Sequence, residues 1–283
     1  MNNWTEWRDA PPCDFAVVGD PIHHSKSPLM HSAAYAALGL NLTYSAVRVP
    51  LEEFEEAVAH LKSLGVKGVN CTLPLKGAAR AWAEARGGLK GEEIGCHPGP
   101  NSVNTLNLTD QTGISTDEAG FLALVKEAIP EEGKPKILIL GAGGTGQALA
   151  YRLIQEGWPV HLWNRTPGKW EAALAAMLGP AVIQTRPNLK EMQVVVNATS
   201  TELQGGRLDL DWSQTSGDVL AIDLLYGKET SFLREASRSG LKTRDGSVML
   251  MEQGALSFEW WLNQPAPRSA MLQAIHGHSS ANK

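Results

Sequence analysis

Short apolar runs alternate with stretches of helical periodicity along the first half of the chain. The expected strands lie at residues 15–18, 43–49 and 66–72, and the expected helices at residues 27–38, 51–63 and 75–86. This alternation predicts an α/β layer structure. After a glycine-rich loop, residues 102–108 and 113–115 predict a β-hairpin, and residues 117–129 predict a helix that leads into a second domain.

The second half of the chain repeats the alternation with shorter strands. Apolar runs predict strands at residues 137–140, 160–163, 181–184, 194–197, 219–222 and 241–243. Continuous apolar strands suit a parallel sheet covered by helices on both faces, which is the doubly wound, Rossmann-type arrangement. A last helix at residues 248–263 carries large apolar side chains and is expected to pack back on the first domain.

The whole pattern predicts an α/β protein with two domains. A length of 283 residues suits about two domains. We expect residues 1–117 to form an α/β domain on which residues 248–283 pack back. Residues 118–247 are expected to form the doubly wound domain.

The strand at residues 137–140 runs directly into a glycine-rich turn and a helix. Gly141, Gly143 and Gly146 form a G-x-G-x-x-G pattern. Such a turn brings backbone N–H groups and the positive end of a helix against a pyrophosphate, which a side chain on the glycines would block. The pattern also occurs in plain tight turns, but the strand and helix that flank it here favour a dinucleotide site.

The end of the next strand indicates which dinucleotide is bound. An NAD-specific site usually carries Asp or Glu about 20 residues after the first glycine, where the carboxylate holds ribose hydroxyls. Here the strand ends in Trp163-Asn164-Arg165-Thr166, without an acidic residue. Arg165 can meet a phosphate with a planar fork of charged donors. The residues therefore favour NADP over NAD.

Composition and charge narrow the range of partners. Hydrophobic residues make up 43% of the chain and charged residues 19%, as in a soluble globular protein, and the formal net charge is -5. Nucleic acid would call for a basic face, so no such partner is expected. The amino terminus shows no secretory pattern, and no apolar run approaches the length of about 18 residues that spans a membrane. We therefore expect a cytoplasmic protein without membrane association.

Reduction of a carbonyl group by hydride leaves an alkoxide that needs a proton, so the first domain should supply a proton donor. His23, His24 and His31 cluster around Ser27, but no carboxylate or cysteine lies at metal-ligand spacing, and no metal site is expected. Lys76 follows a strand and a proline. By spacing alone it is an ordinary surface lysine, so the chemistry leaves the donor open among lysine, histidine and aspartate.

Several separate segments together resemble one enzyme family. Residues 25–31 resemble the motif S-x-S-P-x-x-H, residues 70–76 resemble N-x-T-x-P-x-K, and residues 115–121 resemble N-T-D-x-x-G-F. Further counterparts follow in order, at residues 102–106, 141–146, 164–166, 197–200, 245–246, 249–250 and 253–255. The family is that of the shikimate dehydrogenases, and the resemblance runs roughly from Cys13 to Leu262.

The resemblance implies a reversible, NADPH-dependent reduction of 3-dehydroshikimate to shikimate, in chorismate and aromatic amino-acid biosynthesis. It implies that the first domain binds the substrate and that Lys76 and Asp117 form the catalytic pair. Whether Lys76 donates the proton or mainly orients and stabilises charge stays open. The implied substrate-binding residues are Ser25, Ser27, Asn70, Thr72, Asn104, Tyr226 and Gln253. The implied cofactor-binding residues are Gly141, Gly143, Gly144, Thr145, Gly146, Asn164, Arg165, Thr166, Lys169, Thr199, Leu224 and Gly246.

The chain departs from the family pattern at several positions. Ser115 stands where asparagine is usual, the loop after Tyr226 is shorter and lacks a proline, and Lys169 stands where the phosphate motif usually has a second arginine. Two alternatives stay open: a quinate or shikimate dehydrogenase that uses NAD, and a non-catalytic dinucleotide-binding redox sensor. The presence of both Lys76 and Asp117 argues against the sensor. The residues leave a homodimer open.

Overall fold

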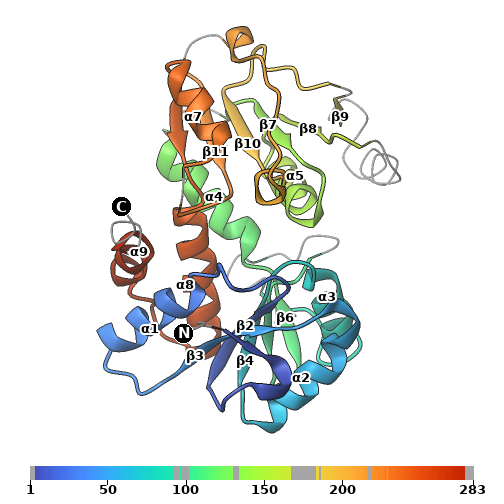
Figure 1. Ribbon diagram of the computed structural model, residues 1–283, viewed down its shortest axis with the longest axis vertical. Helices are drawn as coiled ribbons and strands as arrows, with labels where there is room; N and C mark the ends of the chain where they lie inside the picture. Colours follow the sequence, from blue (N-terminus) through green and yellow to red (C-terminus); the bar gives the residue numbers. More distant parts are fainter. Residues whose placement is uncertain are drawn as a thin grey trace. The chain divides into compact units, whose positions relative to one another are not determined.

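The chain divides into two compact units (Figure 1). The computed structural model describes residues 4–91, 96, 102–129, 134–166, 183–184, 186–215, 218–227 and 229–277. Unit 1 comprises Met1–Phe121 and Leu250–Lys283, and unit 2 comprises Leu122–Met249. Each unit is built around its own six-stranded sheet.

Unit 1 contains a mixed sheet with the strand order β1-β3-β2-β4-β5-β6. Its strands are β1 (Thr5–Glu6), β2 (Phe15–Gly19), β3 (Tyr44–Arg48), β4 (Gly68–Cys71), β5 (Thr105–Asn107) and β6 (Thr112–Ile114). The first four pair in parallel, whereas β5 and β6 are antiparallel to their neighbours, which confirms the expected hairpin. Asn70 pairs with Thr105, and Thr105 with Ile114. The carboxyl ends of β2, β4 and β6 and the start of β5 therefore share one edge, here called the site edge.

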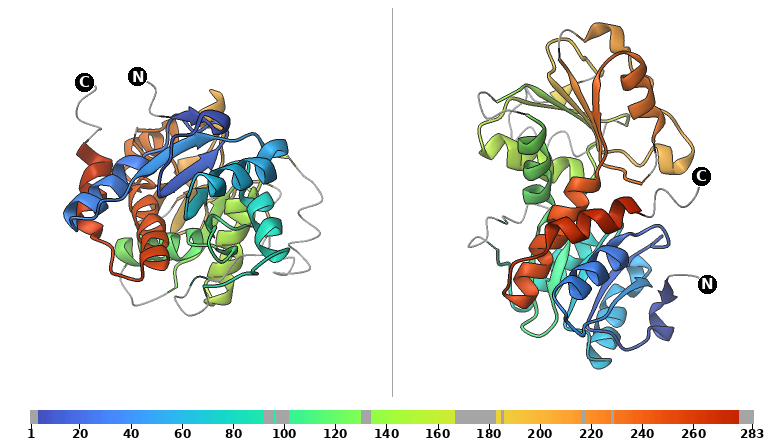
Figure 2. Two further views of the ribbon diagram at one scale, coloured as in Figure 1. Left: turned by 90° about the horizontal axis from the view of Figure 1, so that it is seen from below. Right: turned by 90° about the vertical axis from the view of Figure 1, so that its left-hand side faces the viewer.

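Helices cover both faces of this sheet. They are α1 (Ser27–Ala37), α2 (Phe54–Ser63), α3 (Lys76–Glu84), α8 (Ser247–Leu262) and α9 (Arg268–Gly277), and the short 3₁₀ helices η1 (Trp7–Asp9) and η2 (Leu51–Glu53) precede α1 and α2. Ala16 and Val18 of β2 pack in the apolar cluster of α2 and α3. Phe15 and Val17 pack in the opposite cluster, with α1, α8 and α9. Within this unit α1 and α9 lie side by side (Figure 2). The end of the chain thus completes the core of the first unit.

Unit 2 contains a parallel sheet with the strand order β12-β11-β10-β7-β8-β9. Its strands are β7 (Ile137–Leu140), β8 (Val160–Trp163), β9 (Ile183–Gln184), β10 (Val194–Asn197), β11 (Leu220–Asp223) and β12 (Lys242–Arg244). The chain enters the sheet at β7, runs outward through β8 to β9, and returns beside β7 as β10. This is the strand order of a doubly wound dinucleotide-binding domain. The predicted α/β fold class is confirmed.

Unit 2 contains helices as well. They are α5 (Gly144–Gln155), α7 (Ser231–Arg238) and the part of α4 (Asp117–Ala128) that belongs to unit 2, with the short 3₁₀ helices η5 (Glu202–Gln204) and η6 (Trp212–Gln214). α5 contacts β7 and β8. Leu138 and Leu140 of β7 share a buried cluster with Phe232 and Ala236 of α7. All four residues of β7 are buried, as the continuous apolar run predicts.

Two elements of unit 1, β1 and α9, have no counterpart among the expected elements. β1 consists of two half-buried residues that pair with β3 at the edge of the sheet. Of the helices that the structure describes, none combines the length and apolar character needed to cross a membrane. Within the same described residues, no group of three or more His, Cys, Asp or Glu side chains is arranged to hold a metal ion.

Candidate active site

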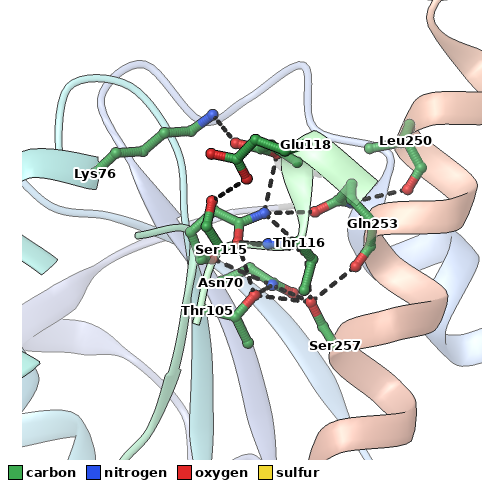
Figure 3. A network of polar contacts seen from close by, with 11 residues as sticks. Asn70, Lys76, Thr105, Ser115, Thr116, Glu118, Leu250, Gln253 and Ser257 are labelled. Carbon is green, nitrogen blue, oxygen red and sulfur yellow. Dashed lines mark hydrogen bonds and ion pairs between the residues drawn. The ribbon is translucent and has the colours of Figure 1, made fainter. Parts of the chain in front are cut away.

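Lys76 and Asp117 meet at the site edge of unit 1. Lys76 is the first residue of α3, which follows β4, and Asp117 is the first residue of α4, which follows β6. The Lys76 Nζ atom lies 2.5 Å from Asp117 Oδ2, and the two side chains are 17% and 8% exposed (Figure 3). An ammonium group held by a carboxylate in such a position is a suitable hydrogen-bond donor for a carbonyl oxygen.

Asn104 contacts the other oxygen of Asp117. Its Nδ2 atom donates to Asp117 Oδ1 at 3.0 Å and lies 3.2 Å from Gln253 Oε1. Its Oδ1 atom accepts the backbone N–H of Thr116 at 2.8 Å. Asn104 is buried, so these contacts are shielded from water. The position of the carboxylate is therefore set by a buried amide and by Lys76 together.

A second buried amide, that of Asn70, connects β4 with β3, β5 and α8. Its Oδ1 atom accepts the hydroxyl of Tyr44 at 2.7 Å. Its Nδ2 atom donates to Thr105 Oγ1 and to Ser257 Oγ, both at 2.9 Å. An amide nitrogen carries two hydrogens, so these two bonds use its donors, and among the described residues the contact with Tyr44 leaves one lone pair of Oδ1 for a further partner.

The remaining expected substrate residues have separate positions. Ser25 lies between β2 and α1, Ser27 is the first residue of α1, both are buried, and the Ser27 N–H donates to Ser25 Oγ at 3.3 Å. Thr72 lies at the site edge because it directly follows the carboxyl end of β4, and its side chain is half-buried. Gln253 lies on α8, and its Nε2 donates to the Leu250 carbonyl at 2.8 Å. Tyr226 lies in unit 2, after β11.

The network in Figure 3 also contains residues to which the family resemblance assigned no role. Ser257 donates to the carbonyl of Gln253 at 2.9 Å and lies 2.8 Å from Thr105 Oγ1. Thr116 supplies both a backbone and a hydroxyl contact to Asn104. The available signal was spacing: Ser257 follows Gln253 by one helical turn, and Thr105 and Thr116 adjoin expected site residues.

Glu118 is another acidic residue at the site edge, and it is 2% exposed. Its Oε2 atom accepts the Ser115 hydroxyl at 2.6 Å, whereas Oε1 is buried with no hydrogen-bond partner in the part of the chain that the structure describes. Burial first, and then the charge of Asp117, raise the pKa of Glu118 to about 7, while Ser115, the residue's own amide and Lys76 act in the opposite direction. The family motif leaves this position open, so no sequence pattern pointed to Glu118.

His31, the histidine of the first motif, is fully buried in unit 1. Its ring stacks on that of Tyr44, with 4.2 Å between centroids and 4° between planes. Burial lowers the pKa of His31 to about 3, so the ring is neutral at ordinary pH. The structure gives this residue a packing role beside Tyr44, the hydrogen-bond partner of Asn70.

The glycine turn of unit 2 is closed on its inner side and open on its outer side. Gly141 has a φ of +106°, and a Cβ atom at Gly146 would lie 1.9 Å from the Gly141 carbonyl oxygen. Gly143 and Gly144 are exposed, and an added Cβ atom at either one would meet nothing within 4 Å. The inner glycines let α5 approach the strand end closely, and the outer ones leave the backbone N–H groups accessible.

Further expected cofactor residues lie at the carboxyl edge of the parallel sheet. The register pairs Asn197 of β10 with Leu140 of β7, and Leu140 with Trp163 of β8. The residues that directly follow these three strand ends therefore lie at the same edge of the sheet. Asn164 Oδ1 accepts the Ala142 N–H at 3.2 Å and so ties the end of β8 to the glycine turn. The other members at this edge or in the turn are Thr145, Arg165, Thr166, Thr199, Leu224 and Gly246, whereas Lys169 lies outside the described residues.

These residues fit a phosphorylated dinucleotide. The open side of Gly143 and Gly144, at the start of α5, can take a pyrophosphate. The exposed Arg165 follows β8, and residues 163–166 carry no carboxylate that would repel a ribose phosphate. A Cβ atom at Gly246 would lie 2.2 Å from the Leu224 carbonyl oxygen, so these two segments pass one another closely at the same end of the sheet.

Family models match both ends of the chain. The shikimate dehydrogenase substrate binding domain matches residues 17–87, and the shikimate 5'-dehydrogenase C-terminal domain matches residues 246–276. A model of ketopantoate reductase matches residues 137–205, which contain the glycine turn. Of the network in Figure 3, the first shikimate dehydrogenase match contains Asn70 and Lys76 and the second contains Gln253 and Ser257, whereas the residues at 104–118 lie between the two matches.

Curated relatives and solved structures extend the match over nearly the whole chain. An NADP(+) shikimate dehydrogenase of Thermococcus kodakarensis is 39% identical, with 92% of this chain and 96% of the relative covered. One from Methanothrix thermoacetophila is 36% identical, also with 92% of this chain and 96% of the relative covered. The shikimate 5-dehydrogenase of Thermus thermophilus, solved with NADP(H) and shikimate, is 37% identical with a TM-score of 0.77, and the alignment covers 93% of this chain and 98% of that one. The chain therefore belongs to the shikimate dehydrogenase family.

Proposed function

We propose that this protein catalyses the reversible NADPH-dependent reduction of 3-dehydroshikimate to shikimate, within chorismate and aromatic amino-acid biosynthesis. The observation that carries the proposal is the contact of 2.5 Å between Lys76 Nζ and Asp117 Oδ2, in a network of amide and hydroxyl groups that also contains the buried carboxyl group of Glu118. The 3-keto group of the substrate needs a proton donor when hydride arrives. The names of the curated relatives favour this function over quinate oxidation with NAD and over a non-catalytic sensor.

In the proposed reaction Lys76 donates a hydrogen bond, and then its proton, to the carbonyl oxygen of 3-dehydroshikimate. Asp117 holds the ammonium group in place through Oδ2. Asn104 holds Asp117 through Oδ1, so the carboxylate does not turn toward the substrate. NADPH supplies the hydride when it is bound. In the reverse direction Lys76 receives the proton of the hydroxyl group that is oxidised.

The proposed substrate-binding residues can be grouped by the part of the substrate that each would bind. Ser25 and Ser27 can donate to the ring carboxylate, and Tyr226 of unit 2 is assigned to the same group by the family pattern. Thr72, Asn104 and Gln253 carry donors and acceptors for the ring hydroxyls. Asn70 has both amide hydrogens in internal bonds, so we assign it an acceptor role through Oδ1. A substrate analogue that lacks a hydroxyl would leave such groups unpaired, at a cost of about 1 to 3 kcal/mol each.

The cofactor residues lie in unit 2. We assign the pyrophosphate to the turn at Gly141, Gly143, Gly144, Thr145 and Gly146, and the ribose phosphate to Asn164, Arg165, Thr166 and Lys169. Thr199, Leu224 and Gly246 then line the same carboxyl edge. The substrate-binding domain corresponds in this proposal to residues 1–117 with 248–283, and the NADP-binding domain to residues 118–247.

Steady-state absorbance at 340 nm tests the proposal in four reactions: NADPH or NADH with 3-dehydroshikimate, and NADP with shikimate or quinate. Faster turnover of 3-dehydroshikimate with NADPH than with NADH, and of shikimate than of quinate with NADP, supports it. NADPH binding without turnover of any pair would leave the sensor as the function. We further expect a cytoplasmic enzyme without a nucleic-acid or membrane partner. Light scattering on the purified protein tests the homodimer that the sequence leaves open.

A further inference from the structure

Glu118 is a buried carboxyl group that the proposed reaction does not use. It directly follows Asp117 in the first turn of α4, and its residue is 2% exposed. A buried carboxyl beside another carboxylate is unfavourable when both are charged. A residue needed only for packing or for the start of a helix would not require a second acidic group here, because Asp117 already places negative charge in the first turn.

The two oxygens of Glu118 have different surroundings. Oε2 accepts the Ser115 hydroxyl at 2.6 Å, and Ser115 is itself fully buried. Oε1 is buried and lacks a hydrogen-bond partner among the described residues. Such an oxygen is satisfied more cheaply as part of a neutral carboxyl group than as part of a carboxylate. Ser115 is also the residue that stands in place of the asparagine usual in the family motif.

The charged groups that act on Glu118 are the two members of the catalytic pair. Asp117, on the same helix, disfavours the ionised form, and Lys76, from α3, favours it. The influence is mutual, since an interaction between two charges changes the proton affinity of both. Figure 3 shows the Glu118 carboxyl group on the same side of the network as the end of the Lys76 side chain.

We propose that Glu118 is a positioning residue for the Lys76–Asp117 pair, a third ionisable group whose charge sets how firmly Lys76 holds its proton. This inference rests on the proposed function. When Glu118 is neutral, Lys76 gives up its proton more readily. When Glu118 is ionised, the added negative charge stabilises the ammonium group. Activity in the reductive direction, which needs the protonated lysine, then persists to higher pH.

The test is the pH profile of kcat/KM for 3-dehydroshikimate with saturating NADPH. Glu118→Gln keeps the shape of the side chain and removes the charge. The basic limb of its profile, that is, the fall of kcat/KM at high pH, should move to lower pH by about one unit. Ser115→Ala removes the donor that favours the ionised form, and its basic limb should lie between those of the wild type and Glu118→Gln. Glu127→Gln, at an exposed position of the same helix, is the matched control and should retain the wild-type profile.

A direct measurement accompanies the kinetics. Infrared difference spectra of the wild type between pH 6 and pH 8.5 should show loss of a protonated carboxyl band that is absent from Glu118→Gln. If Glu118→Gln does not fold, the Ser115→Ala profile decides the matter. If the wild type is active and Glu118→Gln has the same basic limb, the inference is overturned and the proposed function stands. An inactive wild type would overturn the proposed function as well.

Discussion

Asn104 donates a hydrogen bond from Nδ2 to Oδ1 of Asp117 at 3.0 Å, while Lys76 holds the opposite oxygen at 2.5 Å. Each oxygen of the carboxylate thus has its own partner. The amide is itself fixed, because its Oδ1 accepts the Thr116 backbone N–H. Rotation of the carboxylate would break a bond on each side, so the direction in which Lys76 points depends on a residue that carries no charge.

Asn104→Ala should therefore lower kcat/KM for 3-dehydroshikimate by about 10- to 100-fold, the equivalent of one hydrogen bond to a charged group. Asn107→Ala is the matched control, because Asn107 lies at the other end of β5 and its Oδ1 accepts a backbone N–H of the following turn. Initial rates and a melting curve should be recorded for both. Equal losses of activity in the two variants, with both folded, would contradict the positioning role of Asn104.

Arg165→Ala tests the choice of cofactor. Arg165 is exposed after β8, where no acidic residue is present to bind ribose hydroxyls. A guanidinium–phosphate contact is a charge-assisted bond, so its loss should raise the Kd of NADPH about 10- to 100-fold and change the Kd of NADH little. Fluorescence titration measures both constants.

The control for this prediction is Arg238→Ala, which removes an exposed arginine at the end of α7 in the same unit. It changes the net charge equally and should leave both Kd values near those of the wild type. A parallel weakening of NADPH and NADH in Arg165→Ala would show that Arg165 makes no contact specific to the phosphate.

His31→Phe should reduce the acid sensitivity of folding. The folded-state pKa of His31 is lowered to about 3 by burial, below its ordinary value of 6.5. Its contribution to stability is therefore present above pH 6.5 and is lost as the pH falls from there toward 3. At pH 5 the loss amounts to about 2 kcal/mol, since one pKa unit corresponds to about 1.4 kcal/mol.

Urea unfolding at pH 7 and pH 5 measures this effect. The free energy of unfolding should fall less between the two values in His31→Phe than in the wild type, because phenylalanine retains the stack on Tyr44 without titrating. His276→Gln, at an exposed position on α9, should behave like the wild type. An unchanged pH dependence in His31→Phe would mean that protonation of this ring does not destabilise the folded state.

Much of the fold was predictable because the local patterns agree with the tertiary structure. The apolar run at Ile137–Leu140 predicted a strand buried on both faces, and all its residues are buried. The hairpin of β5 and β6 and the late helix α8 also followed from periodicity. In contrast, β1 is two residues long and half-buried, and α9 buries only Met271 and Ile275, so neither pattern was strong enough to predict an element.

The site was less predictable from local sequence patterns than the fold. Lys76 and Asp117 are separated by 41 positions, and periodicity says nothing of their contact, whereas the family motifs paired them and the structure has them hydrogen-bonded. Ser257 and Glu118 were not foreseen. Their positions in the network depend on burial and on neighbours from other elements, for Ser257 the amide of Asn70 and for Glu118 the Lys76–Asp117 pair. Such cross-strand relationships have no local signature.

The contact between Lys76 and Asp117 is most directly tested by NADPH oxidation with 3-dehydroshikimate in the wild type, Lys76→Ala and Lys62→Ala. Lys62 is an exposed lysine of α2 in the same unit. We predict that Lys76→Ala lowers kcat by about 10² to 10⁴, with a small change in NADPH affinity, and that Lys62→Ala has the wild-type kcat. An equal kcat in all three folded proteins would contradict the assignment of Lys76 as the proton donor.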